Sequence, residues 1–221
     1  MAFAPRNPPI RVSPIKLAVA ASGGGTTLQN LIDRIAEDRL TAKIVQVIAN
    51  KPDIGALARA EKADIPGQLI ERKGKSLRTF SHEIFAAVRE ARADLLVLAG
   101  FLALIEIPND YAGRVINIHP SLIPAFCGLG FHGRAVHEAA IRMGVKVSGC
   151  TVHFADQSYD TGPIILQKSV PVFASDTTDD LAARVFQAEC EALPEAIRLF
   201  ATGRLQVVDR VVHVRLDATE M

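Results

Sequence analysis

Three side chains able to do organic chemistry lie within residues 115–160. Asn117 and His119 are two apart at the end of a short apolar run, so on an extended backbone both point to the same face. A carboxamide can donate to an oxyanion while an imidazole moves protons. Asp160 follows in a polar loop, from which its carboxylate can orient the imidazole and fix its tautomer. The spacing therefore predicts a catalytic group of Asn117, His119 and Asp160.

An isolated Asn-x-His pair at a strand end has a simpler interpretation, namely a turn with a hydrogen-bonded histidine. Pro120 and Pro124 favour the catalytic interpretation, because they stiffen the chain that leaves the pair. A strand that ends in polar residues is also where open α/β sheets place their ligand sites.

A second candidate site is the glycine loop, residues 22–27, which leads from an apolar run into a helical period. Backbone N–H groups at such a helix start form an anion site suited to phosphate. The loop is not GxGxxG, because Thr26, Thr27 and Leu28 follow where the third glycine belongs. Near Lys75 the earlier glycine of a Walker loop is missing, since position 69 is Leu69. A tight strand-to-helix turn without a ligand is the alternative for the glycine loop.

Composition excludes several classes of protein. Lys plus Arg number 25 against 24 for Asp plus Glu, so the chain has no large excess of positive charge that would indicate a nucleic acid partner. Three scattered cysteines argue against a disulfide framework and a zinc ribbon, and favour a reducing, cytoplasmic location. His132 and His137 are five apart and make no metal motif, so no metal is expected. No apolar run approaches the roughly 20 residues that span a bilayer, and the proline-rich start lacks a signal-peptide core.

Apolar runs and helical periods alternate along the chain, which predicts an α/β fold with a single doubly wound, mostly parallel sheet and helices on both faces. We expect an N-terminal arm over 1–15, one domain over 16–205 and a hairpin or tail over 206–221. The expected strands are 17–21, 43–49, 68–70, 94–99, 115–118, 146–154 and 164–172, with a terminal hairpin of 207–208 and 211–216. The expected helices are 26–36, 54–60, 76–92, 134–143 and 178–201, the last capped by residues 175–177.

Three motifs together resemble the folate-dependent formyltransferases. They are Asn117-Ile118-His119-Pro120-Ser121-Leu122, then Gly149-Cys150-Thr151-Val152-His153-Phe154, then Asp160 before Gly162-Pro163-Ile164-Ile165. The similarity runs from about residue 16 to about residue 205. It implies that Asn117, His119 and Asp160 are the catalytic trio. It also implies formyl transfer from 10-formyltetrahydrofolate to the amine of glycinamide ribonucleotide in purine biosynthesis, by a monomer or homodimer.

The resemblance also implies roles for residues outside the trio. Gly25, Thr26 and Thr27 would hold the substrate phosphate, although the family often has asparagine where Gly24 and Thr27 stand. Glu189 would lie near the glycinamide end of the substrate. The folate side would be formed by Leu102, Ala103, Leu104, Ile105, Asn117 and the less certainly aligned Arg78, with His137 as a supporting residue. Residues 127–136 are longer than is usual in the family.

The implied mechanism is direct acyl transfer without a metal or a covalent enzyme intermediate. The substrate amine attacks the formyl carbon, and Asn117 with a protonated His119 stabilises the tetrahedral oxyanion. Asp160 is expected to hold His119 and raise its pKa above the ordinary value of about 6.5. His119, or water ordered by Asp160, then passes the proton to the departing folate nitrogen.

Three alternatives remain open from the sequence. A formyltetrahydrofolate hydrolase shares the trio but normally carries an extra N-terminal domain, for which the residues before Lys16 are too few. A methionyl-tRNA formyltransferase usually adds a C-terminal barrel and a basic surface, for which the residues after Leu205 are too few and the charge is too balanced. A non-catalytic nucleotide-binding module would use the glycine loop and leave the trio unexplained.

Overall fold

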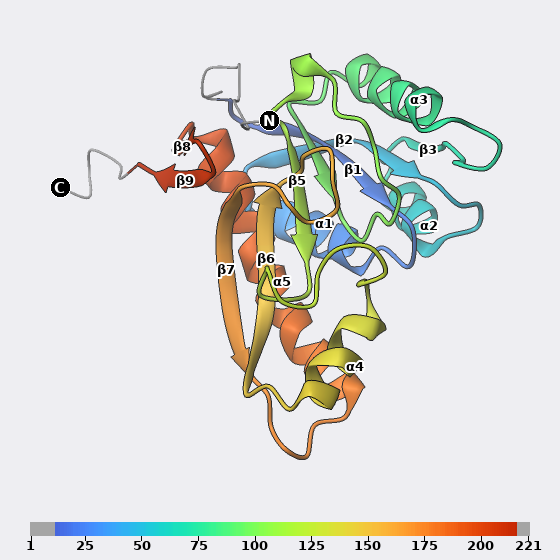
Figure 1. The fold of residues 1–221 in the computed structure, drawn as a ribbon. Coiled ribbons are helices and arrows are strands. Elements are labelled where there is room, and N and C mark those ends of the chain that lie inside the picture. Colours follow the sequence, from blue (N-terminus) through green and yellow to red (C-terminus); the bar gives the residue numbers. More distant parts are fainter. Residues whose placement is uncertain (1–11, 216–221) are drawn as a thin grey trace.

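The computed structural model describes residues 12–215, which form a seven-stranded sheet and a two-stranded hairpin (Figure 1). The order across the large sheet is β3-β2-β1-β4-β5-β6-β7, in which β1 to β5 pair in parallel and β6 and β7 are antiparallel. Its strands are β1 (Ile15–Ala21), β2 (Ala42–Ala49), β3 (Gly67–Leu69), β4 (Leu95–Leu98), β5 (Val115–His119), β6 (Val147–Phe154) and β7 (Ile164–Pro171). The hairpin consists of β8 (Leu205–Val208) and β9 (Val211–Val214).

Helices cover both faces of the sheet, as predicted. Leu17 and Val19 of β1 pack into one core, and the intervening Ala18 and Ala20 pack into a second core on the opposite face. The first core is closed by α1 (Thr26–Ala36), α2 (Gly55–Lys62), α4 (Arg134–Met143) and α5 (Thr178–Ala201). The second is closed by α3 (Leu77–Glu90) and the 3-10 turn η1 (Asn109–Tyr111).

Side-chain caps set the starts of the two longest helices. Ser76 accepts a hydrogen bond from the Thr79 amide at 3.0 Å at the start of α3. Thr177 and Asp180 form a reciprocal capping box at the start of α5, in which each side chain accepts from the other residue's amide. Helix α1 differs, because its N-cap is Gly25 and no side chain caps it. The amides of its first turn are therefore left for another partner.

The carboxyl ends of β1, β4 and β5 meet at one edge of the sheet, where the parallel strands lie side by side (Figure 1). The buried hydroxyl of Ser22, just after β1, accepts a hydrogen bond from the Leu102 amide at 2.9 Å. The Ser22 amide donates to the Gly100 carbonyl at 3.1 Å. These bonds tie the glycine loop to the segment that follows β4, so both segments border the same edge as β5.

The predicted elements all occur, with small shifts at their ends. Helices α1, α4 and α5 have the predicted bounds, whereas α2 begins one residue later and ends two residues later than predicted. The predicted hairpin forms as β8 and β9, although Leu216 lies outside the described residues. Residues 1–11 of the predicted N-terminal arm also lie outside the described residues. Ile15, which the prediction placed in the arm, is the first residue of β1. Across residues 12–215, no helix has the length and hydropathy needed to cross a membrane.

Candidate active site

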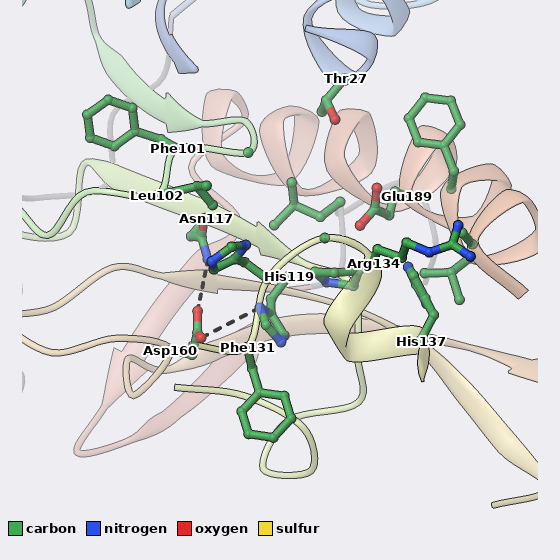
Figure 2. A pocket seen from close by; sticks show the side chains of 18 of the residues that line it. Thr27, Phe101, Leu102, Asn117, His119, Phe131, Arg134, His137, Asp160 and Glu189 are labelled. Carbon is green, nitrogen blue, oxygen red and sulfur yellow. Dashed lines mark hydrogen bonds and ion pairs between the residues drawn. The ribbon is translucent and has the colours of Figure 1, made fainter. Parts of the chain in front are cut away.

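The structure brings the three predicted catalytic side chains together. Asn117 and His119 lie on β5 and Asp160 lies in the loop between β6 and β7 (Figure 2). The His119 Nδ1 is 3.5 Å from the Asp160 Oδ2, and the Asn117 Nδ2 donates to the Asp160 Oδ1 at 3.2 Å. Asp160 thus accepts a hydrogen bond from the Asn117 amide with one oxygen and lies beside the His119 ring with the other.

Asp160 has contacts besides those with Asn117 and His119. Its backbone φ is +56°, in the left-handed region, and the Gly128 amide donates to its Oδ2 at 2.9 Å. Burial raises the pKa of Asp160, but the neighbouring His153 and His119 rings and the Gly128 amide together hold it below its ordinary value. The carboxylate is therefore ionised at neutral pH and acts as a hydrogen-bond acceptor.

The tautomer of His119 follows from its other ring nitrogen. Nε2 lies 2.9 Å from the Phe126 carbonyl oxygen, which can only accept, so Nε2 carries a proton. In the neutral ring Nδ1 is then unprotonated and faces Asp160. A protonated ring would place a positive charge against that carboxylate.

The predicted rise in the pKa of His119 is wrong. Its side chain is only 5% exposed, and this burial lowers the pKa of His119 below its ordinary value. The Asp160 carboxylate and the Phe126 carbonyl oppose the effect without cancelling it, and His153 adds to it. Desolvation of the imidazolium therefore outweighs its attraction to the carboxylate, and His119 is neutral at neutral pH in the absence of substrate.

His153 is a member of the site that the sequence reasoning quoted in a motif but did not select. Antiparallel pairing sets it opposite Asn117, and its Nε2 is 3.0 Å from the Asn117 Nδ2. Its Nδ1 donates to the Phe154 carbonyl at 2.8 Å, which leaves Nε2 to accept from Asn117. The Asn117 amide thus donates to both His153 and Asp160. An antiparallel register for 146–154 against 115–118 would have revealed this contact.

A cavity of about 610 Å³ opens beside the trio. Asn117, His119 and Asp160 line one side, and Figure 2 shows Thr27 and Glu189 on the other. Apolar side chains complete the wall: they are Phe101, Leu102, Leu129, Phe131, Ala182, Val185 and Phe186. The cavity therefore joins the catalytic group to the glycine loop across an apolar surface, as a ligand site requires.

The glycine loop presents unpaired amides at the cavity edge. Among residues 12–215 the amides of Gly25, Thr26 and Thr27 have no backbone or side-chain acceptor. Thr26 and Thr27 line the cavity, and Gly25 precedes them with φ +74°. A side chain at Gly25 would press on the Ala56 backbone, since an added Cβ would lie 2.8 Å from the Ala56 Cα. Gly24 is different, because nothing lies within 4 Å of a Cβ added there.

The segment after β4 forms a second, smaller recess of about 60 Å³ beside Asn117 and Asp160. Ala103, Leu104 and Ile105 line it, and Ile105 is buried. Leu102 faces the main cavity instead. The predicted folate residues thus divide between two adjoining hollows. Arg78 is an exposed residue in the first turn of α3 and lines neither hollow, so its role stays a prediction.

Two further predicted residues line the main cavity. Burial raises the pKa of Glu189 to about 7, so this carboxyl exchanges its proton near neutral pH. His137 on α4 is buried, and its Nδ1 has no hydrogen-bond partner among the described residues. Burial lowers the pKa of His137, which keeps this ring neutral. Both side chains can therefore exchange hydrogen bonds with a polar ligand.

Metal ligation was not predicted. Within residues 12–215, no cluster of three or more His, Cys, Asp or Glu side chains is arranged to hold a metal ion. The three cysteines are free thiols.

Residues 15–197 match the family model described as Formyl transferase. A phosphoribosylglycinamide formyltransferase of Haemophilus influenzae is 37% identical over 202 residues, which cover 90% of this chain and 93% of that protein. The trifunctional purine biosynthetic protein adenosine-3 of Gallus gallus is 39% identical over 201 residues, which cover 90% of this chain. The chain spans only 20% of the length of that trifunctional relative.

Solved structures agree with the sequence comparison. The glycinamide ribonucleotide transformylase 1 of Symbiobacterium toebii is 40% identical and superposes with a TM-score of 0.83, over 90% of this chain and 93% of that chain. The likeness covers 90% of this chain, so it reaches well beyond the three short motifs that first indicated it.

Proposed function

Because the chain belongs to the formyl transferase family, we propose that it transfers the formyl group of 10-formyltetrahydrofolate to the amine of glycinamide ribonucleotide in purine biosynthesis. The observation that carries the proposal is the cavity of about 610 Å³, which joins the trio to the free amides at the start of α1. One substrate carries both an amine and a phosphate, and the cavity has a matching group at each end.

The site residues divide between the two substrates. Thr26, Thr27 and Gly25 offer backbone N–H groups to the phosphate, and Glu189 accepts from the amine end of the same molecule. The folate is an apolar ring system with polar edges, which suits the two adjoining hollows: Ala103 to Ile105 line the smaller one and Leu102 lines the main cavity.

The chemistry runs through a tetrahedral oxyanion. The substrate nitrogen forms a bond to the formyl carbon, the bond to the folate nitrogen breaks, and one proton passes from the amine to the folate. Both donors that could stabilise the oxyanion are occupied in the free protein, since Asn117 donates to Asp160 and His153, and His119 Nε2 donates to the Phe126 carbonyl. For His119 to stabilise the oxyanion, its Nε2–H exchanges the Phe126 carbonyl for the oxyanion. When the neutral ring takes up the proton that the amine loses, Asp160 stabilises the resulting imidazolium, which then gives one proton to the departing folate nitrogen.

We expect loss of the formyl group from the folate to depend on glycinamide ribonucleotide. A hydrolase would use water and would not need the phosphate site, whereas a transferase needs the amine. The measurement follows folate absorbance with the protein and 10-formyltetrahydrofolate, in the presence and absence of glycinamide ribonucleotide. Equal rates in both mixtures would contradict the proposal and favour a formyltetrahydrofolate hydrolase, the runner-up function.

The glycine loop supplies a second prediction. Gly25→Ala forces a methyl group against the Ala56 backbone at a residue with positive φ, so it displaces the loop amides and lowers thermal stability. We expect the KM for glycinamide ribonucleotide to rise about tenfold, with the KM for the folate unchanged. Kinetics with each substrate varied in turn provides the measurement.

Gly24→Ala serves as the matched control for the Gly25 variant. Its methyl group meets no protein atom, and the family often has a larger asparagine at this position, so both KM values should match those of the unmodified protein. If folded Gly25→Ala binds both substrates as the unmodified protein does, the loop is a structural turn and the phosphate lies elsewhere. A cytoplasmic location and a monomeric or homodimeric state stay predictions.

A further inference from the structure

A contact that the proposed function does not yet explain lies behind the glycine loop. Arg59 on α2 donates from Nε to the Gly24 carbonyl at 2.9 Å and from a terminal nitrogen to the Gln29 side chain on α1 at 2.8 Å. Arg59 is partly buried and does not line the catalytic cavity. We propose that Arg59 is a positioning residue for the phosphate of the substrate, acting through the glycine loop. The inference rests on the proposed function, in which that loop holds the phosphate.

The Arg59 contact sets the orientation of one peptide unit in the glycine loop. In a planar trans peptide the C=O and the following N–H point in opposite directions. By bonding the Gly24 carbonyl, Arg59 fixes the orientation of that unit, so the Gly25 N–H points away from α2. That N–H has no acceptor among residues 12–215. The contact therefore keeps the Gly25 N–H turned away from α2, so that it is available to a ligand.

The same contact also gives the Gly24 carbonyl a partner. In a regular helix continued backward from α1, this oxygen would accept from the Leu28 amide, but within the described chain no such bond forms. The Arg59 guanidinium donates to this oxygen instead. The partial negative charge of the carbonyl is therefore paired with Arg59 and does not repel an anion at the helix start. The positive charge behind the loop also adds a favourable field for phosphate.

Contacts between the two helices also fix the spacing of α1 and α2 at the loop. The Ala56 amide donates to the Gly23 carbonyl at 3.2 Å, and Gly25 sits against Ala56 without room for a side chain. Arg59 adds a planar fork that reaches the loop and the first turns of α1 together. A lysine has one ammonium in place of this fork, so it keeps the charge but cannot hold both acceptors in the same way.

The test compares Arg59→Gln and Arg59→Lys with the unmodified protein on two amine substrates, glycinamide ribonucleotide and its riboside without the phosphate. We expect Arg59→Gln to raise the KM for the ribonucleotide about tenfold. The kcat, the KM for the folate and the KM for the riboside should be unchanged. Arg59→Lys should recover part of the loss. A matched control is Arg39→Gln, because Arg39 lies beyond the far end of α1 with its side chain 59% exposed.

The outcomes separate this inference from the proposed function. If the unmodified protein does not prefer the ribonucleotide over the riboside, the phosphate cradle itself is wrong and the role of Arg59 is overturned with it. If that preference exists but survives intact in Arg59→Gln, the cradle stands and Arg59 is only structural. Equal losses on the ribonucleotide, the riboside and the folate would also overturn the inference, because general loosening would explain them. If Arg59→Gln fails to fold, Arg59→Lys alone decides by the same ratio.

Discussion

His119→Ala should lower turnover about a hundredfold or more, with little change in the folded structure. The ring is the group that can carry a proton beside the reacting carbon, and its Nε2 already bears one. Alanine removes both the donor to the oxyanion and the proton carrier. His119 is the last residue of β5, at the carboxyl end of the parallel strands, so its removal should lower kcat. Circular dichroism should show an unchanged fold.

The matched control for this variant is His82→Ala. His82 is an exposed histidine on α3, so its removal changes the histidine count without touching the cavity. Turnover of that variant should match the unmodified protein. If His119→Ala keeps near-normal turnover, the imidazole has no part in the reaction and the oxyanion must be stabilised by other groups.

Local sequence patterns predicted most of the helices and strands. Thr177, one of the three residues predicted to cap α5, forms a capping box with Asp180, and α4 has its predicted bounds of Arg134 and Met143. These features depend on residues near one another in the chain, where spacing alone is informative. The antiparallel pairing of β6 and β7 is different, because it depends on which strands meet across the sheet. Their apolar runs predicted strands without predicting direction.

The same distinction applies to the site. Asn117 and His119 could be placed on one face because they share a strand, and the family resemblance added Asp160. The low pKa of His119 could not be predicted, since it depends on how far the surrounding elements bury the ring. Arg59 was missed for a related reason: its contact with Gly24 joins two helices through residues far apart in the chain. Neither the burial of His119 nor the contact of Arg59 with Gly24 can be recognised from the spacing of residues in the sequence.

Asp160→Asn tests the centre of the site with almost no change in volume. The carboxylate accepts from Asn117 through one oxygen and from Gly128 through the other, whereas asparagine offers one acceptor and one NH₂ group. One of these two contacts is therefore lost, and the negative charge beside His119 is lost as well. We expect turnover to fall about a hundredfold or more, because the imidazolium formed during the reaction loses its counter-charge.

The His119 titration gives this variant a second readout that is independent of turnover. Asp160 raises the pKa of His119 against the larger opposing effect of burial. Removing the carboxylate must therefore lower the pKa of His119 further, so the ring stays neutral to a lower pH than in the unmodified protein. Histidine NMR signals followed against pH measure this shift. Asp33→Asn, at an exposed carboxylate on α1, should leave both the titration and turnover unchanged. An unchanged His119 titration in Asp160→Asn would show that the two groups are not coupled as their 3.5 Å separation indicates.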